Sequence, residues 1–370
     1  MSAENFIINL EELGWDSSFA EHFHQLEEPG LVPARVVSVQ RNSYQVFTTS
    51  GELSAQVAGK MRHRTSSGEL YPAVGDWVAI QPLAGEPKGV IQAILPRKSQ
   101  FSRQAPGGRQ RLSGGKTEEQ VVAANIDTVF LVSGLDGGRN LNLRSIERYL
   151  AIAWSSGAVP VIVLNKVDLC PDVETRIRDV EPISPGVPVH AVSATEQLGM
   201  DALRKYLTGG STVALLGPSG VGKSAIINAL LGMERQTVGT VREIDRRGRH
   251  TTTRRELILL PGGGAVIDSP GMREIQVWGD EASLNDAFDD ISQIAKRCRF
   301  SDCRHRTEPG CAVQSAIQRG ELDASRLENY QKLQRELNHL AARQDDRTRL
   351  EEKTKWKKIS QWQKRIQKNK

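Results

Sequence analysis

A glycine-rich segment near the middle of the chain has the residues of a phosphate-binding loop. It runs Gly217-Pro-Ser-Gly-Val-Gly-Lys-Ser224 and lies between an apolar run, which predicts a strand, and residues 225–231, which predict a helix. Its glycines let successive backbone N–H groups face a phosphate, and the dipole of the helix N-terminus adds positive potential. Lys223 would hold the β- and γ-phosphates, and the Ser224 hydroxyl would ligate Mg²⁺. The glycines concerned are Gly217, Gly220 and Gly222.

A second motif, Asn165-Lys-Val-Asp168, directly follows another apolar run and is expected at the end of a strand. Together with a phosphate loop, this tetrapeptide resembles the guanine-reading motif of the GTPase superfamily. The resemblance implies that Asp168 accepts hydrogen bonds from N1–H and the exocyclic amine of guanine, whereas adenine would leave these groups mispaired. It also implies that Asn165 ties loops together and that Lys166 lies along the base.

Two further segments at the ends of apolar runs resemble loops of the same superfamily. Ser193 and Ala194 resemble the loop that supplies a backbone N–H to the guanine base. Asp268-Ser-Pro-Gly271 resembles the superfamily's Asp-x-x-Gly motif. By this resemblance, Asp268 holds Mg²⁺ through water and the N–H of Gly271 senses the γ-phosphate.

Residues 249–254, Arg-His-Thr-Thr-Thr-Arg, lie between the phosphate loop and Asp268 and have the polar, basic character of a mobile switch. One threonine of this segment would complete the Mg²⁺ shell. Thr252 is the first choice for this ligand and Thr251 is the second.

The residue that prepares water for attack is expected to differ from that of Ras-like enzymes. Met272 stands where those enzymes have the glutamine that orients the attacking water, and a methionine cannot do this. His250 is the predicted catalytic residue, because an imidazole can position or deprotonate water near neutral pH. The alternative is a solvated loop histidine without a catalytic role.

Three cysteines and one histidine are spaced as a metal site, Cys298-x₄-Cys303-x-His305-x₅-Cys311. Cys₃His is a complete tetrahedral ligand set with no open position, so it predicts one structural Zn²⁺ rather than a catalytic metal. Unrelated thiols are the alternative. The clustering also indicates a reducing compartment rather than a disulfide framework. Cys170 lies far from this cluster and is expected to have no role.

The apolar pattern that must position these motifs changes along the chain. Between residues 31 and 95, short runs with period-two alternation predict about five strands and a small closed barrel of the OB type. Such a barrel either contacts nucleic acid or serves as a protein contact or spacer. From residue 120 to 271, apolar strands alternate with helical patterns such as 143–154. This alternation predicts a largely parallel sheet covered on both faces, with ligands at the carboxyl ends of its strands.

The predicted fold class is multidomain, with an N-terminal OB-type β-barrel, a central α/β P-loop GTPase domain and a C-terminal α-helical zinc-binding domain. Residues 96–117 carry six bases and no acid among Gly and Pro, which predicts a linker or a loop that contacts RNA phosphates. The predicted boundaries are an acidic extension with one short helix at 1–30, the barrel at 31–100, a basic linker at 101–119, the GTPase domain at 120–280, the zinc-binding domain at 281–345 and a basic tail at 346–370.

The net charge of +5 is unevenly distributed along the 370 residues. Residues 1–30 contain seven acids and no Lys or Arg, for −7, whereas residues 341–370 contain eleven bases and four acids, for +7. A basic tail favours a polyanionic partner. Because the N-terminus lacks the pattern of a secretory signal and no apolar run is long enough to span a membrane, we expect a cytoplasmic protein.

The last eighteen residues, 353–370, combine eight bases with no acid and four large apolar residues. Their spacing predicts a basic amphipathic helix that forms on a partner. RNA is the favoured partner, since phosphates neutralise the bases and Trp stacks on exposed bases. A membrane surface and a merely solvated helical end are the alternatives. The apolar residues are Trp356, Ile359, Trp362 and Ile366, and residues 327–340 predict a further amphipathic helix.

The order of the motifs differs from that of Ras-like proteins, because the guanine-reading motifs precede the phosphate loop. This circular permutation, the barrel and the zinc segment together resemble the circularly permuted ribosome small subunit-dependent GTPases of bacteria. The resemblance covers about residues 31–340. It implies a monomer that hydrolyses GTP to GDP on the small ribosomal subunit, contacts its rRNA and assists its late maturation.

Two other functions stay open. One is a nucleotide-gated rRNA-binding assembly protein whose hydrolysis is incidental. The other is an ATPase, which would require that Asp168 does not read the base. The acidic extension at 1–30 is left without a role, although it could restrain the basic tail until RNA competes for it.

Overall fold

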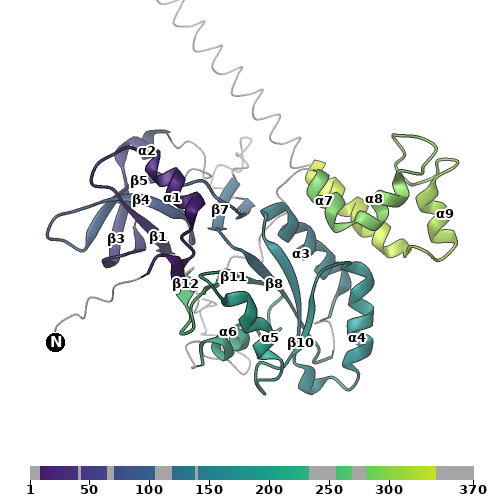
Figure 1. Ribbon diagram of the computed structural model, residues 1–370. Coiled ribbons are helices and arrows are strands. Elements are labelled where there is room, and N and C mark those ends of the chain that lie inside the picture. Colours follow the sequence, from purple (N-terminus) through teal and green to yellow (C-terminus); the bar gives the residue numbers. More distant parts are fainter. Residues whose placement is uncertain are drawn as a thin grey trace, which may run out of the picture.

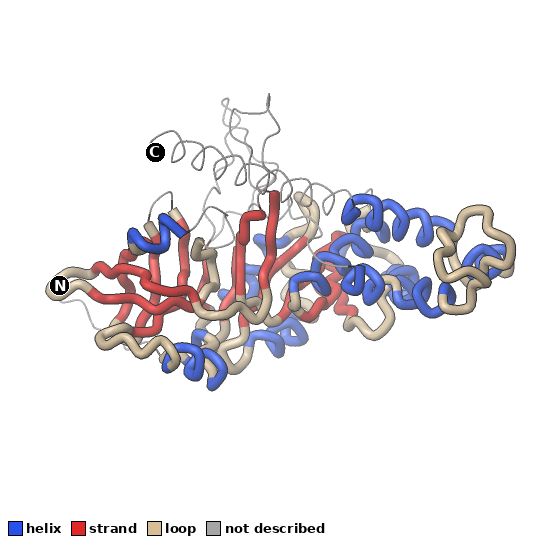
Figure 2. Tube along the Cα trace, turned by 90° about the horizontal axis from the view of Figure 1, so that it is seen from above, coloured by secondary structure: helices blue, strands red, loops and turns tan. Residues whose placement is uncertain are grey.

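Three parts of the chain lie in a row: a barrel formed by the first strands, a sheet flanked by helices, and a group of helices (Figures 1 and 2). This computed structural model describes residues 9–40, 43–64, 71–104, 119–137, 141–232, 256–268 and 281–338. Within these ranges, every helix is too short or too polar to cross a membrane.

The first five strands form the predicted closed barrel. The strand order is β1-β2-β3-β5-β4, and β1 also pairs with β4, which closes the ring. Period-two alternation places one face of each strand inside, where Val36, Val46 and Ile80 are fully buried. The elements are β1 (Val32–Val39), β2 (Tyr44–Thr48), β3 (Gly51–Val57), α2 (Gly59–Arg64), β4 (Trp77–Pro82) and β5 (Lys88–Ile94).

The acidic N-terminal segment packs against this barrel. It contains η1 (Glu11–Leu13) and the predicted short helix, α1 (Ser17–His24), whose first turn is capped by the Asp16 carboxylate. Leu13 and Phe19 are buried in one cluster with Trp77 and Leu95 of the barrel region. Although this segment is acidic in composition, one of its faces is therefore apolar and covers barrel residues.

Arg35 joins the N-terminal segment, the barrel and the central sheet. Its guanidinium donates to the carbonyl of Leu13, to the carbonyl of Asn125 at 3.0 Å and to the Thr212 hydroxyl at 2.9 Å. Burial lowers the pKa of Arg35 to about 10, an effect that the charges of Asp127 and Asp76 oppose. Arg35 therefore stays protonated at neutral pH, and its bonds hold three parts of the fold together.

The region between barrel and sheet departs from the predicted linker at 96–117. Its beginning is strand β6 (Gln100–Gln104), which pairs with β7 (Glu119–Ala124) in a separate two-stranded sheet. The prediction of a linker is wrong for 100–104, where buried Phe101 and Ser102 anchor the strand. The rest of the predicted linker, 105–118, lies outside the described residues.

The central sheet has the order β10-β9-β8-β11-β13-β12, and only β12 runs antiparallel to its neighbour. The largely parallel sheet is thus confirmed. Its strands are β8 (Thr128–Gly134), β9 (Val159–Asn165), β10 (Val189–Val192), β11 (Thr212–Leu216), β12 (Glu256–Leu259) and β13 (Ala265–Asp268).

Helices cover both faces of this sheet, as predicted. Leu131 and Ile162 pack with Ile146 of α3, whereas Phe130 and Val161 pack with Ile226 of α6 in a second core. The flanking elements are α3 (Leu143–Ser156), η3 (Val167–Leu169), α4 (Val173–Val180), η4 (Glu181–Ile183), α5 (Met200–Arg204), η5 (Lys205–Leu207) and α6 (Lys223–Leu231).

Barrel and central sheet share hydrogen-bonded strands. Ser38 of β1 pairs with Glu256 of β12, so the two form one continuous sheet of eleven strands. β12 is therefore the strand through which the barrel adjoins the sheet.

The third part is helical, as predicted. Phe288 and Leu333 are buried in the same core cluster as Ile146 of α3, so these helices pack on the central domain. The elements are α7 (Glu281–Ala287), α8 (Asp289–Ala295), α9 (Ala312–Gln318) and a helix over 324–338. That last helix confirms the amphipathic pattern predicted at 327–340 as far as residue 338, and the predicted tail helix lies outside the described residues.

Candidate nucleotide and metal sites

The motifs predicted to bind nucleotide meet at one edge of the central sheet. β9 ends at Asn165, β10 just before Ser193, β11 just before Gly217 and β13 at Asp268. The chain runs outward from β8 through β9 to β10 and then returns to place β11 on the other side of β8. Parallel sheets bind ligands at the carboxyl ends of their strands beside such a reversal of order.

Asn165 connects two loops at this edge. Its side-chain amide donates to the carbonyl of Val221 in the phosphate loop at 2.9 Å. Its carboxamide oxygen accepts from the N–H of Ala194 at 3.1 Å, and the Asn165 side chain is buried. A buried amide that uses both ends fixes the spacing of the loops it joins.

The phosphate loop leads directly into helix α6. Gly217, Gly220 and Gly222 all have positive φ, at 152°, 85° and 96°, and Gly222 is the N-cap of α6. Lys223 folds over the loop and donates to the carbonyls of Gly217 and Pro218 at 2.8 and 2.6 Å. Ser224 lies in the first turn of the helix, so its hydroxyl stands at the positive end of the helix dipole.

The rest of the guanine-reading motif lies beside this loop. Lys166 has a left-handed backbone with φ 68°, and its ammonium pairs with Asp136 at 2.5 Å. Asp168 is exposed in η3. Ser193 is buried, and its hydroxyl accepts from the N–H of Glu196 at 3.2 Å.

Asp136 was not predicted as a site residue. It follows β8, and a search for polar residues just after every apolar run, rather than for known motifs alone, would have found it.

Asp268 ends β13 as predicted. The remaining predicted switch residues lie outside the described residues: His250, Thr251, Thr252, Gly271 and Met272.

Cys298, Cys303, His305 and Cys311 come together as one cluster, with all four ligand atoms within 4.8 Å of one another. Nδ1 of His305 lies 3.6 Å from Sγ of Cys298 and 3.5 Å from Sγ of Cys311, and the two sulfurs are 4.0 Å apart. A tetrahedral zinc ion with bonds of about 2.3 Å to sulfur separates its ligand atoms by about 3.8 Å. The donor set and its dimensions therefore fit a closed metal site.

Local structure positions these four ligands. Cys311 is the N-cap of α9 and accepts from the N–H of Gln314 at 3.4 Å. Gln314 in turn donates to the carbonyl of His305 at 2.7 Å. Burial lowers the pKa of His305, which favours the neutral imidazole that a metal ligand requires.

An ion-pair network joins the metal-binding part to α3. Arg326 donates to Glu147 at 2.7 Å and to both carboxylate oxygens of Asp290 at 2.6 and 2.8 Å. Asn329 donates to the second oxygen of Glu147 at 2.5 Å. Desolvation by burial raises the pKa of Glu147, against the effect of Arg326. The network satisfies each buried charge with more than one hydrogen bond.

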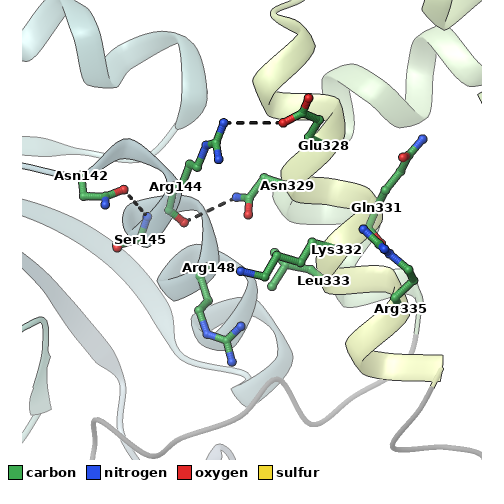
Figure 3. A pocket seen from close by; sticks show the side chains of 10 residues that line it. All are labelled: Asn142, Arg144, Ser145, Arg148, Glu328, Asn329, Gln331, Lys332, Leu333 and Arg335. Carbon is green, nitrogen blue, oxygen red and sulfur yellow. Dashed lines mark hydrogen bonds and ion pairs between the residues drawn. The ribbon is translucent and has the colours of Figure 1, made fainter.

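A surface groove of about 500 Å³ lies over this junction, between α3 and the helix at 324–338 (Figure 3). Arg144 pairs with Glu328 across it at 3.7 Å, and Asn329 donates to the carbonyl of Arg144 at 3.4 Å. Of the predicted nucleotide-binding residues that the structure describes, none lines this groove. The groove marks the junction of two parts rather than the nucleotide site.

Comparisons with known proteins agree with this geometry. The family model described as RsgA GTPase matches residues 94–278. A model described as ABC transporter matches residues 200–368, which contain the phosphate loop but not the motif at 165–168. The protein named small ribosomal subunit biogenesis GTPase RsgA from Opitutus terrae is 45% identical over 96% of this chain and 97% of its own length. Its namesake from Streptomyces avermitilis is 42% identical over 93% and 90%.

Solved structures show the same fold. The crystal structure of YjeQ from Thermotoga maritima has 30% identity and a TM-score of 0.62, over 83% of this chain and 98% of that one. YloQ, described as a circularly permuted GTPase, has a TM-score of 0.57 at 21% identity, over 85% of this chain and 97% of that one, and supports the fold alone. Identity above 40% along nearly the whole chain, with the phosphate loop and guanine motif at one sheet edge, leads to one conclusion: this chain belongs to the RsgA GTPase family.

Proposed function

We propose that this protein hydrolyses GTP to GDP on the small ribosomal subunit and thereby assists a late stage of the subunit's maturation. The observation that carries the proposal is the side chain of Asn165, which joins the guanine-reading loops to the phosphate loop. The ribosomal partner is inferred from the relatives, which are named small ribosomal subunit biogenesis GTPases.

Guanine selectivity is assigned to Asp168, whose exposed carboxylate would accept from two donors of the base. The phosphates would lie on the loop at 217–224, with Lys223 moving from the loop carbonyls to the β- and γ-phosphates. An ammonium that already stands over the loop needs only a side-chain rotation to do so.

Mg²⁺ would be held by the Ser224 hydroxyl and, through water, by Asp268, with Thr252 completing the shell. Support comes from the sheet, because β11 leads to Ser224 and its parallel neighbour β13 ends at Asp268. When bound, Mg²⁺ would neutralise the charge that develops on the phosphates.

His250 is proposed as the residue that positions the attacking water, because Met272 cannot do so. Gly271 is proposed to sense the γ-phosphate through its N–H, as its resemblance to the glycine of the Asp-x-x-Gly motif implies. Purified protein should hydrolyse GTP slowly alone and faster with small subunits, and His250→Ala should remove hydrolysis while GTP affinity stays unchanged. No stimulation by subunits would count against the ribosomal role, and full activity of His250→Ala would reject the assignment of His250.

The closed barrel supports a second candidate, an rRNA-binding assembly protein in which nucleotide gates binding and hydrolysis is incidental. His250→Ala separates the two candidates. If the variant loses hydrolysis but still supports subunit maturation, the binding function is favoured. An ATPase is the third possibility, and competition of ATP against GTP for the site tests it.

The Cys₃His cluster is proposed to hold one structural Zn²⁺, since it offers four ligands and leaves no position for substrate. We further propose that the protein acts as a monomer in the cytoplasm, where its ribosomal partner would be found. The basic segments at 105–117 and 353–370 are the proposed rRNA contacts.

A further inference from the structure

Asp136 lies beside the guanine-reading motif although it belongs to none of the predicted motifs. Gly134, the last residue of β8, pairs with Asn165 of β9, and the N–H of Leu135 donates to the carbonyl of Asn165 at 2.8 Å. These contacts place Asp136, the residue after Leu135, opposite Lys166, the residue after Asn165. The carboxylate of Asp136 accordingly lies 2.5 Å from the ammonium of Lys166.

Lys166 is held at both of its ends. Its left-handed backbone, with φ 68°, turns the chain immediately after β9. Its ammonium is held by Asp136, and the two side chains are only 25% and 21% exposed. Between these ends, the methylene stem of Lys166 approaches the phosphate loop. Its Cε lies 4.0 Å from the position that a Cβ would take on Gly222 of that loop. The stem therefore passes between the two loops that the nucleotide would join.

We propose that Asp136 is a positioning residue for guanine binding. By pairing with the ammonium, it holds the methylene stem of Lys166 where the face of the base would pack. A free lysine has several rotatable bonds, and ordering them on binding weakens affinity, whereas a stem that is already ordered avoids this loss. The inference rests on the guanine-binding role proposed above for Lys166, and it assigns no contact with the nucleotide to Asp136 itself.

A purely structural ion pair would behave differently. Removal of a pair that served folding alone would lower the melting temperature and leave nucleotide affinity unchanged. A positioning role instead predicts a loss of nucleotide affinity that depends on Lys166. It also predicts an increase in KM without a change in kcat, because the chemistry lies at the far end of the nucleotide.

The test uses the full chain and measures the Kd of fluorescent GTP and GDP analogues together with KM and kcat for GTP. Asp136→Asn keeps the shape of the side chain but removes its charge, and it should raise Kd for both nucleotides and KM by about threefold to tenfold. Asp136→Glu, which restores the charge, should recover most of the affinity. Asp201→Asn is the matched control, since it breaks an ion pair with Arg204 of 2.7 Å on α5 and should change nothing.

Lys166→Met provides the decisive comparison, because methionine keeps an unbranched stem without the ammonium. In that background, Asp136→Asn should have no further effect on Kd. An unchanged Kd for Asp136→Asn alone would overturn the inference. A double variant whose increase in Kd equals the product of the increases in the two single variants would also overturn it, because the effect of Asp136 would then not depend on Lys166. Failure of the unmodified protein to bind guanine nucleotides would instead reject the proposed function, so the two failures are distinguishable.

Discussion

The side-chain amide of Asn165 occupies the space that a Cβ on Gly222 would need. Gly222 also has a φ of 96°, so both its backbone and its surroundings require glycine. The two residues come from different motifs, one associated with guanine and one with phosphate. Their contact means that neither loop can shift without the other.

Gly222→Ala should therefore weaken GTP binding by tenfold or more, about the effect of losing the two hydrogen bonds of the displaced Asn165 amide. Titration with a fluorescent GTP analogue measures this. Gly232→Ala at the C-terminal end of α6 is the control, because φ there is 67° but nothing lies within 4 Å of the added methyl group. Equal losses in both variants would show that backbone strain alone, and not the contact with Asn165, weakens binding.

Arg326→Ala should lower the free energy of unfolding by about 3–5 kcal/mol, because it leaves the buried Glu147 without its positively charged partner. Urea denaturation followed by circular dichroism measures the change. Arg319→Ala removes an exposed ion pair with Glu321 and should hardly change the free energy of unfolding. Similar values for both variants would contradict a stabilising role for the buried network.

Phe19→Ala should destabilise the protein by about 3 kcal/mol, since it opens a cavity against Trp77, whose ring centroid lies 5.9 Å away. The fluorescence of the barrel tryptophan should shift as water enters. Deletion of residues 1–28 should have a larger effect on stability. If the deletion changed only the salt dependence of RNA binding, the segment would act on the basic tail rather than on the barrel.

Asp16 makes part of this packing dependent on pH. Desolvation raises its pKa, but the hydrogen bond from Lys98 and the N–H groups of Phe19 and Ser18 outweigh that effect and bring the pKa below its ordinary value of 3.8. A depressed folded-state pKa contributes stability that is present above pH 3.8 and is lost as the pH falls through the folded value.

Asp16→Ala should accordingly cost about 1 kcal/mol of unfolding free energy at neutral pH, mainly through loss of the N-cap. The difference in unfolding free energy between this variant and the unmodified protein should decrease below pH 3.8. Glu21→Ala, at an exposed position of the same helix, should leave stability nearly unchanged across this range. If this difference in unfolding free energy stayed constant as the pH falls, the ionised carboxylate of Asp16 would not be the source of the stabilisation.

Metal removal should unfold the segment between α8 and α9, which supplies the four ligands, and should fray the start of α9, whose N-cap is Cys311. We expect one zinc per chain by elemental analysis, loss of that zinc in Cys303→Ser, and loss of helical signal on chelation. Cys170→Ser, far from the cluster, should keep full zinc content. A chelated protein with unchanged helicity would show that the metal is not needed for folding.

Local patterns sufficed for the strands of the barrel and of the central sheet, and for the edge of that sheet where the motifs gather. Glycine spacing marked the phosphate loop, and period-two alternation marked the barrel. The spacing of Cys298, Cys303, His305 and Cys311 likewise predicted a cluster that the structure brings together.

Contacts between distant segments escaped prediction because no local pattern encodes them. The segment 1–30 is mostly acidic, and its few apolar side chains, such as Phe19, gave no sign that they pack against the barrel. Arg35 resembles any surface arginine until folding surrounds it with carbonyl groups. Strand β6 was missed because it lies within a basic segment that contains Gly and Pro, although its Phe101 and Ser102 are buried.

The strand order has a consequence for synthesis of the chain. β8, β9 and β10 leave the ribosome before β11, so the half of the sheet that carries Asn165 can form first. β11 then adds to β8, and β13 adds to β11 afterwards and completes the proposed phosphate-binding edge. A growing chain of this protein can therefore close the proposed nucleotide site only after translation has passed Asp268.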